Sequence, residues 1–156
     1  MSETTGVYLR CRVGREWYAV NVDSVLRVLH LVALTELPDS RPDVLGLLTL
    51  PDRVATVIDL RRRFGLVDTT LHLETPIVAV DTPSGAVGLV VDEADDIETI
   101  DEGQIEPYTD GVSPYVASVA RCADYLLLLL DIPSLGAEAR LQEQSNQPRP
   151  VRADSQ

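Results

Sequence analysis

The chain has 156 residues, of which 45% are hydrophobic, and a formal net charge of −12 at pH 7. This length suits one ordinary domain or two very small barrels that share a core, and the apolar content is enough to form that core. Nucleic-acid and anionic-membrane partners are disfavoured, because binding phosphate groups needs a basic face that this composition does not supply.

The N-terminal segment lacks the basic and apolar regions of a secretion signal. The longest apolar run, Tyr125 to Leu130, is six residues long, whereas a membrane-spanning helix needs about 20. Cys11 and Cys122 each lie in an apolar stretch. We therefore expect a cytoplasmic protein with two buried free thiols, a long-range disulfide being the alternative.

The N-terminal part of the chain predicts a hairpin followed by a short helix. Residues 7–13 alternate apolar and polar side chains, a pattern typical of a half-buried strand. Residues 17–20 should return beside them after a turn. Asn21 can cap a short helix over residues 22–29, whose apolar side chains recur with helical spacing. Residues 30–34 then predict a further strand.

A second hairpin and a short capped helix follow in the sequence. Residues 47–50 and 53–58 predict two strands around the tight turn Pro51-Asp52. Asp59 stands where a helix cap is expected, and Gly65 can close the helix that follows.

The second half of the chain again predicts short strands separated by turns, and it ends in a predicted tail. The second strand of a last hairpin should be covered on both sides, because it has no polar face, and a short helix follows it. From Glu143 onward the composition indicates disorder. Roughly nine short strands without long crossover helices predict a barrel or a sandwich. The predicted strands are residues 76–80, 86–91, 97–100, 115–121 and 125–130.

The sequence contains no recognisable catalytic or metal-binding motif. His30 and His72 do not stand in a motif with Ser or Cys, so we expect structural or surface histidines. The acidic stretch 92–106 fails the pattern of a calcium-binding loop, since Ile97 and Gly103 stand where Gly and Glu are required. We expect a solvated acidic face there, or else a docking surface for a basic partner.

Two further charged features have structural interpretations. The run Arg61-Arg62-Arg63 is expected to form the solvent-facing side of a short helix, with anion binding as the weaker alternative. Asp59 and Asp92 each follow an apolar run and are expected to be end caps, although a catalytic pair is conceivable. We expect a protein that is not an enzyme and needs no cofactor or metal.

The order of several short motifs is more specific than any of them alone. Two blocks carry most of the signal, Val57-Ile58-Asp59-Leu60-Arg61 and Gly88-Leu89-Val90-Val91-Asp92. The other motifs are Tyr8-Leu9-x-Cys11-x-Val13-Gly14, Trp17-Tyr18-Ala19-Val20, Val22-x-x-Val25-x-x-Val28, Leu37-Pro38 with Gly46, and Ile105-Glu106-Pro107. From about Val7 to Leu135 this series closely resembles the CheW-like family of bacterial chemotaxis coupling proteins.

The resemblance implies two small SH3-like five-stranded β-barrels that share a hydrophobic interface, within one domain over residues 1–142, followed by a disordered tail over 143–156. It also implies a non-catalytic adaptor at cytoplasmic receptor arrays, linking the tip of a methyl-accepting chemoreceptor to a CheA-type histidine kinase. In that family the groove between the barrels receives receptor helices, a common mode of recognition. By position, Val25, Gly46 and Val91 would line that region.

The chain departs from the family at one hairpin. The family usually carries Asn-Leu-Arg-Gly between its fourth and fifth strands, whereas Thr49, Leu50, Pro51 and Asp52 stand here. The Asn and Arg donors are lost, a negative charge replaces a positive one, and Pro51 removes a backbone N–H. We expect these four residues to lie at a partner surface and kinase binding to be weak or absent, so that the chain competes with the linkage.

The stretch 108–114 is also short for the family. A coupling-type adaptor for another output, such as twitching or gliding motility, is the alternative. A small-ligand binder or an enzyme on the same fold is a remote alternative.

Overall fold

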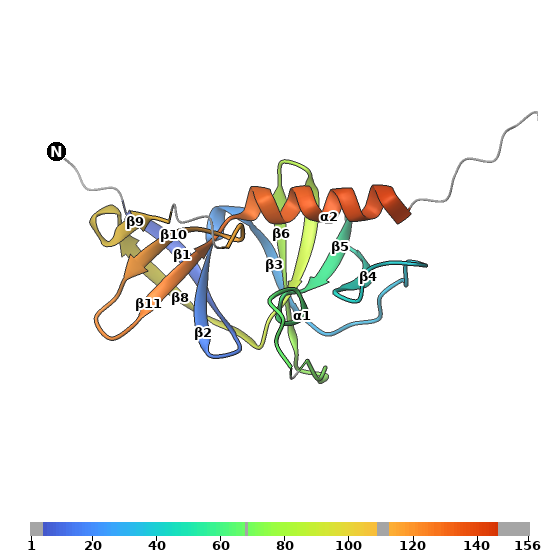
Figure 1. Ribbon diagram of the computed structural model, residues 1–156, viewed down its shortest axis with the longest axis horizontal. Helices are drawn as coiled ribbons and strands as arrows, with labels where there is room; N and C mark the ends of the chain where they lie inside the picture. The colour runs from blue at the N-terminus through green and yellow to red at the C-terminus, as the bar shows by residue number, and fades with distance from the viewer. Residues whose placement is uncertain (1–4, 68, 109–112, 147–156) are drawn as a thin grey trace, which may run out of the picture.

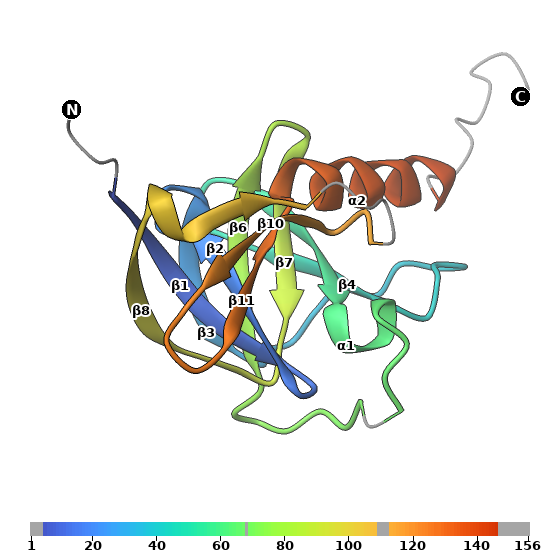
Figure 2. The ribbon, with the colours of Figure 1, turned by 60° about the vertical axis from the view of Figure 1, so that its left-hand side comes forward.

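The computed structural model describes residues 5–67, 69–108 and 113–146, and shows two curled β-sheets side by side (Figure 1). A long helix, α2, runs along one side of the pair and lies over the second sheet. Seen from another direction, each sheet bends around on itself into a small barrel (Figure 2). The prediction of a mostly β fold built from two small barrels is confirmed, but the first sheet has six strands rather than the five predicted.

The first barrel is a six-stranded sheet in the order β8-β1-β2-β11-β10-β9. All neighbouring strands are antiparallel except β2 and β11, which run parallel. A single 3-10 turn, η2 (Glu102–Gln104), joins β8 to β9. The strands are β1 (Thr5–Val13), β2 (Glu16–Asn21), β8 (Glu93–Asp101), β9 (Ile105–Pro107), β10 (Val116–Arg121) and β11 (Leu126–Leu130).

The second barrel is a five-stranded sheet in the order β3-β6-β7-β5-β4, in which only β5 and β7 are parallel. An isolated bridge between Thr35 and Leu47 ties the segment after β3 to β4. The short helix α1 (Leu60–Arg63) follows β5 directly. The strands are β3 (Val25–His30), β4 (Val44–Thr49), β5 (Val54–Asp59), β6 (Pro76–Thr82) and β7 (Gly85–Val90).

Three apolar clusters hold the molecule together. One consists of residues of the first barrel and a second of residues of the second barrel, while the largest draws side chains from both barrels and from both α-helices. The predicted free thiols are confirmed, although Cys122 is only half-buried. Cys11 belongs to the shared cluster, where burial raises the pKa of its thiol to about 12.

The predicted helix over residues 22–29 is wrong. Only η1 (Val22–Ser24) is helical, and Asn21 caps it by accepting a hydrogen bond from the Asp23 backbone N–H at 2.9 Å. Val25–His30 then forms β3 and pairs with β6, so residues 30–34 are not the strand that the sequence predicted. Pairing with a buried strand, together with the β preference of branched valines, outweighs the helical spacing.

The C-terminal helix is longer than predicted. α2 (Ile132–Asn146) has 15 residues and continues past Glu143, where the tail was expected to begin. Leu135 and Ala139 of α2 are buried in the shared cluster, so tertiary packing supports the first two turns of this helix. Residues 147–156 and 109–112 lie outside the described residues, so the tail beyond Asn146 and the shortened stretch 108–114 stay predictions.

Candidate functional site

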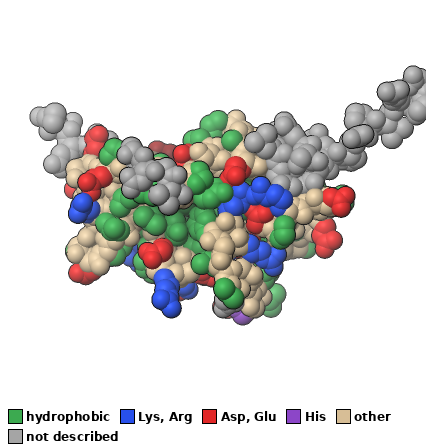
Figure 3. Space-filling model, viewed as in Figure 1, with side chains coloured by type: hydrophobic (Ala, Val, Ile, Leu, Met, Phe, Trp, Pro, Cys, Tyr) green, Lys and Arg blue, Asp and Glu red, His purple; other side chains and the backbone are tan. Residues whose placement is uncertain are grey.

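An open, mainly apolar groove lies between the two barrels. The end of β1, the turn after it and the start of β2 form one wall, and the segment that follows α1 forms the other. Hydrophobic side chains gather near this junction in the space-filling view (Figure 3). We call this the interbarrel groove, and its lining residues are Val13, Gly14, Arg15, Glu16, Tyr18, Phe64, Leu66 and Val67.

The floor and the rim of the interbarrel groove differ in character. Phe64 lies between two aromatic rings, with ring centroids 5.3 Å from Tyr18 and 5.5 Å from Tyr115, so aromatic packing stabilises the floor. At the rim, Val67 is 100% exposed and Leu66 is partly exposed. Contiguous exposed apolar side chains beside a groove are typical of a protein-docking surface.

Gly14 allows the two walls of the groove to approach closely. Its φ of +64° lies in the left-handed region, and a Cβ here would stand 2.8 Å from Cδ1 of Leu66. Its backbone N–H donates to Oδ2 of Asp92 at 2.7 Å. The glycine therefore combines a tight turn in the first barrel with close contact to the second.

Arg61 fixes the segment that carries the rim of the groove. It donates from Nε and Nη2 to the two carboxylate oxygens of Asp59, both at 3.0 Å, and from Nη1 to Asp92 at 3.3 Å. It also donates to the carbonyl oxygens of Thr70 at 2.9 Å and Thr69 at 3.2 Å. A guanidinium has five N–H donors, and these five bonds provide each donor with an acceptor.

These contacts change the interpretation of the arginine run. Arg61 and Arg63 have only 4% and 6% of their side chains exposed, so the expectation that the run faces solvent is wrong for both. Burial acts to lower the pKa of Arg61, but the hydrogen bonds and charges of Asp59 and Asp92 outweigh it and raise the pKa. The helix folds against the shared core, and buried carboxylates compensate the two buried charges.

The end-cap interpretation is correct for Asp59, whereas the contacts of Asp92 join the two barrels. Asp59 accepts from the Arg61 backbone N–H at 3.0 Å and so caps α1. Asp92 connects the barrels, because it accepts from Gly14 of the first barrel and from Arg61 of the second, and its N–H donates to the Arg12 carbonyl at 2.8 Å.

A second open groove lies beside the hairpin that joins β4 to β5. Its lining residues are Leu26, Arg27, Leu50, Pro51 and Asp52, and we call it the hairpin groove. The groove thus brings together the first residues of β3 with three of the four hairpin residues predicted at a partner surface. Thr49, the fourth of them, is exposed at the end of β4.

Arg53 is a residue of this hairpin that sequence reasoning missed. Its guanidinium pairs with Asp52 at 3.4 Å and with Asp81 at 3.0 Å. A positive charge is therefore present two positions after Pro51, held by two exposed carboxylates. Its place directly after the altered tetrapeptide was the signal that could have identified it.

The other three predicted partner residues lie away from the lining of both grooves. Val25 is half-buried against the shared cluster and Val91 is buried within it. Gly46 is buried in β4 with φ of +144°, and a Cβ there would lie 2.4 Å from the Thr35 carbonyl oxygen. Their role in partner binding stays a prediction.

The acidic stretch is only partly the solvated face that the sequence predicted. Asp96 and Glu98 of β8 pair with Arg10, and Glu93 pairs with Arg12 at 3.2 Å. Arg10 in turn lies 4.5 Å from the centroid of the Trp17 ring, which is within the range of cation–π attraction. Two arginines of β1 thus neutralise part of the charge of β8.

Metal-ligating side chains do not cluster in the described part of the chain. Among the side chains that the structure describes, which exclude those of residues 95 and 140–146, no three His, Cys, Asp or Glu groups are placed to hold a metal ion. His30 and His72 line one shallow hollow and are exposed, as predicted for surface histidines. None of the described helices is long and apolar enough to cross a membrane.

Comparison with known proteins identifies the family. The family model described as "CheW-like domain" matches residues 7–140. The chain belongs to the CheW-like family. A CheW-like relative, the chemotaxis protein CheW of Bacillus subtilis, is 31% identical over 138 residues, which cover 86% of this chain and 85% of the relative. The chemotaxis protein CheW of Rhizobium meliloti is 30% identical over 110 residues, covering 70% and 71%.

A solved structure supports the CheW-like fold. The crystal structure of the scaffolding protein TtCheW from Thermoanaerobacter tengcongensis superposes with a TM-score of 0.75 at 24% sequence identity. The match covers 82% of this chain and 90% of that chain. The fold class predicted from the sequence, two small SH3-like barrels, is therefore confirmed.

Proposed function

We propose that this protein is a non-catalytic adaptor of a bacterial chemosensory pathway, and that it works at receptor arrays in the cytoplasm. The observation that carries the proposal is the presence of two separate open grooves, formed by different elements, on a chain of the CheW-like family. An adaptor must bind more than one partner, and separate grooves allow two partners to bind without displacing each other.

The interbarrel groove is the proposed site for the cytoplasmic tip of a methyl-accepting chemoreceptor. An amphipathic helix can place its apolar face against Tyr18 and Phe64 while Leu66 and Val67 close over its side. Arg15 and Glu16 at the same groove offer one charge of each sign to the polar face of the helix. Arg61 supports the binding indirectly, because it holds the backbone that follows Val67.

The hairpin groove is the proposed site for a CheA-type histidine kinase, with altered strength. Pro51 supplies neither the guanidinium nor the backbone N–H that the Arg of the family's usual tetrapeptide offers there, and Asp52 adds a negative charge. Arg53 restores a positive charge, but Asp52 and Asp81 already compensate it. We therefore expect weak kinase binding, so that this chain competes with kinase recruitment when it occupies a receptor.

Substitution at the rim of the interbarrel groove tests the receptor site. Val67→Asp should weaken binding of a receptor cytoplasmic fragment by about tenfold or more, because a charge then opposes the apolar face of the helix. Val67 is fully exposed, so the fold should be unchanged. Ile97→Asp is the matched control, since Ile97 is an exposed apolar residue on β8 outside both grooves. Equal loss in both variants would contradict the proposed site.

Restoration of the hairpin tests the kinase site. Pro51→Arg combined with Asp52→Gly should strengthen binding of the kinase regulatory domain and leave receptor binding unchanged. Unchanged kinase affinity would show that the hairpin does not determine it. Calorimetric titration of the full chain measures both affinities directly.

A further inference from the structure

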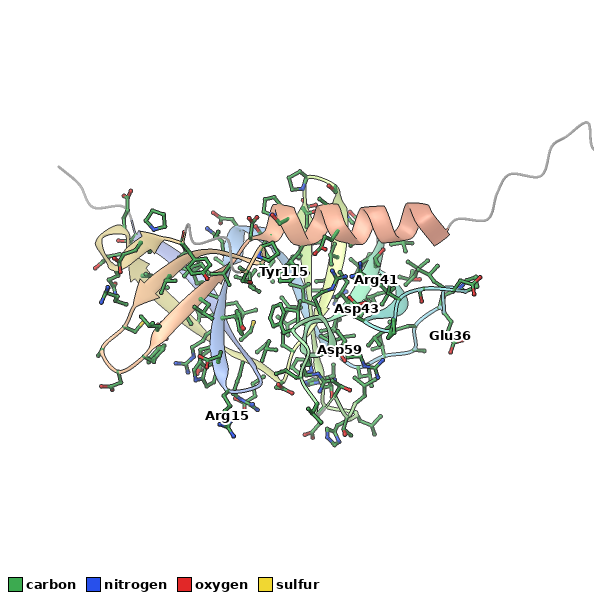
Figure 4. The ribbon with its side chains drawn as sticks, viewed as in Figure 1. Arg15, Glu36, Arg41, Asp43, Asp59 and Tyr115 are labelled. Atoms are coloured by element: carbon green, nitrogen blue, oxygen red, sulfur yellow. The ribbon has the colours of Figure 1, made fainter. Side chains whose placement is uncertain are left out.

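Arg63, the last residue of α1, contacts three other parts of the molecule. Its Nε donates to the carboxylate of Asp43, which lies just before β4. Its Nη1 pairs with Glu138 of α2 at 2.9 Å and donates to the hydroxyl of Tyr115 at 3.4 Å. Tyr115 and Asp43 both lie below α2 in the view of Figure 4. Because the Arg63 side chain is almost fully buried, these contacts hold its guanidinium in one place.

The contact between Arg63 and Tyr115 crosses from one barrel to the other. Arg63 follows β5 of the second barrel, whereas Tyr115 directly precedes β10 of the first. The guanidinium lies 5.9 Å from the centroid of the Tyr115 ring, which is just within the range of cation–π attraction. The ring of Phe64, the residue after Arg63, lies 5.5 Å from the same ring. Arg63 and Phe64 therefore hold one ring together at the floor of the interbarrel groove.

α2 supports both ends of this contact. The Tyr115 carbonyl accepts from the Asp131 N–H at 2.8 Å, and the Asp131 side chain accepts from the Ser134 N–H at 3.1 Å in the first turn of α2. Glu138, further along the same helix, pairs with Arg63. One helix thus fixes Tyr115 at its start and Arg63 along its length. We call Arg63, Tyr115 and Glu138 the brace.

Loss of the Arg63 guanidinium should leave both of its carboxylate partners compensated. Asp43 also pairs with Arg41 at 3.1 Å, and 36% of the Glu138 side chain is exposed to solvent. A substitution in an ion pair is most harmful to the fold when it leaves a buried charge without a partner. Replacement of Arg63 is therefore expected to change the geometry of the groove floor and to retain the fold.

We propose that Arg63 is a positioning residue for the helix that binds in the interbarrel groove. Arg63 does not line the groove, so it acts through the rings of Phe64 and Tyr115. A binding surface works only when supporting contacts hold its side chains close to the productive geometry. Through Glu138, α2 contributes to binding although it lies outside the groove. This inference rests on the proposed receptor site and adds the residues that determine its geometry.

The ring contacts can be measured without any partner. Phe64 is the one phenylalanine of the chain, so NMR of the full chain assigns its ring protons without ambiguity. Nuclear Overhauser contacts should join Phe64 to Tyr18 and to Tyr115, whose ring centroids lie 5.3 and 5.5 Å away. Arg63→Gln should weaken the contact with Tyr115 and keep the contact with Tyr18. An unchanged contact with Tyr115 would overturn the proposal.

Titration with a receptor cytoplasmic fragment measures the effect on binding. Arg63→Gln should weaken binding about tenfold, which corresponds to about one molecule in ten keeping the binding geometry. Arg63→Lys should recover part of the affinity, because it keeps the charge but not the planar fork. Ile77→Val is the matched control, since it removes a buried methyl group from the separate cluster of the second barrel and should leave affinity unchanged. Every titration is run well below the unfolding temperature of the variant, so unfolded protein does not lower the affinity.

A double-mutant cycle tests the part assigned to α2. Glu138→Gln should weaken receptor binding about threefold, and combining it with Arg63→Gln should cause little further loss, because both substitutions break the same contact. Two losses of affinity that simply multiply would overturn the role of α2.

The inference and the proposed function can be told apart in these measurements. If the unchanged protein binds no receptor fragment, the proposed function is contradicted and the inference falls with it. If the unchanged protein binds and Arg63→Gln binds equally well, or Ile77→Val loses as much affinity as Arg63→Gln, the inference alone is overturned.

Discussion

Replacing Arg61 with leucine should strongly destabilise the protein. The side chain of Asp59 is fully buried and that of Arg61 is 4% exposed. Removing the guanidinium leaves a buried carboxylate whose remaining contacts are the Arg61 backbone N–H at 3.0 Å and the longer ion pair with Nε of Arg62 at 3.6 Å. Breaking a buried ion pair in this way costs about 3–5 kcal/mol, a large part of the roughly 5–15 kcal/mol by which a domain is stable.

Urea unfolding followed by Trp17 fluorescence measures this effect, since Trp17 is the one tryptophan of the chain. With a slope of about 2 kcal/mol per molar, the midpoint should fall by roughly 2 M. Arg62→Leu is the control on the same helix, and it should shift the midpoint far less because Arg62 is partly exposed.

A double-mutant cycle decides whether the ion pair is the cause. Asp59→Leu combined with Arg61→Leu removes both charges, so this protein should be more stable than Arg61→Leu alone. If the two losses simply add, the charges are not coupled and the reasoning is refuted.

Three further predictions concern single groups. Burial acts to raise the pKa of Asp43, but its hydrogen bonds to arginine lower it below 3.8, so the stability it contributes above that pH is lost on acidification. Asp43→Asn should flatten this pH dependence in urea titrations. Burial raises the pKa of Cys11 to about 12 and also raises that of Cys122. Ellman's reagent should therefore label the half-buried Cys122 slowly, and Cys11 only after unfolding. Gly46→Ala should cost about 1–3 kcal/mol through backbone strain, whereas Gly103→Ala, with no atom within 4 Å of the added methyl, should be neutral in thermal unfolding.

The alternation of apolar and polar residues predicted a strand well where one face of the strand is buried and the other is more exposed. Residues 7–13 alternate in sequence, and β1 alternates buried and more exposed side chains in the same way. The helix cap at Asp59 was equally predictable, because an aspartate directly before a short helical segment commonly serves as its N-cap. These features depend on neighbours in the chain, so the sequence alone was sufficient.

Features that depend on distant residues were not predictable. The apolar residues within 22–29 recur with helical spacing, yet most of this segment forms a strand that pairs with β6. Arg61 and Arg63 resemble a solvent-facing pair until Asp92, Asp43 and Glu138 are brought to them from other elements. A local pattern does not contain these partners.

The candidate site was predicted in part. The hairpin Thr49–Asp52 was singled out because it departs from a family pattern, and three of its residues do line a groove. A groove between the barrels was expected, but its lining was not, because the groove joins the β1–β2 hairpin of one barrel to the segment after α1 of the other. Position in the family pattern was the only reason to assign Val25, Gly46 and Val91 to the groove. The structure was needed to show what surrounds them.

The most direct test of the adaptor role is a calorimetric titration of the full chain with a cognate receptor cytoplasmic fragment and with the regulatory domain of a CheA-type kinase. The account predicts saturable binding of the receptor fragment, lost in Val67→Asp and retained in Ile97→Asp, together with weak binding of the kinase domain. A folded protein that shows no saturable binding of the receptor fragment would contradict it.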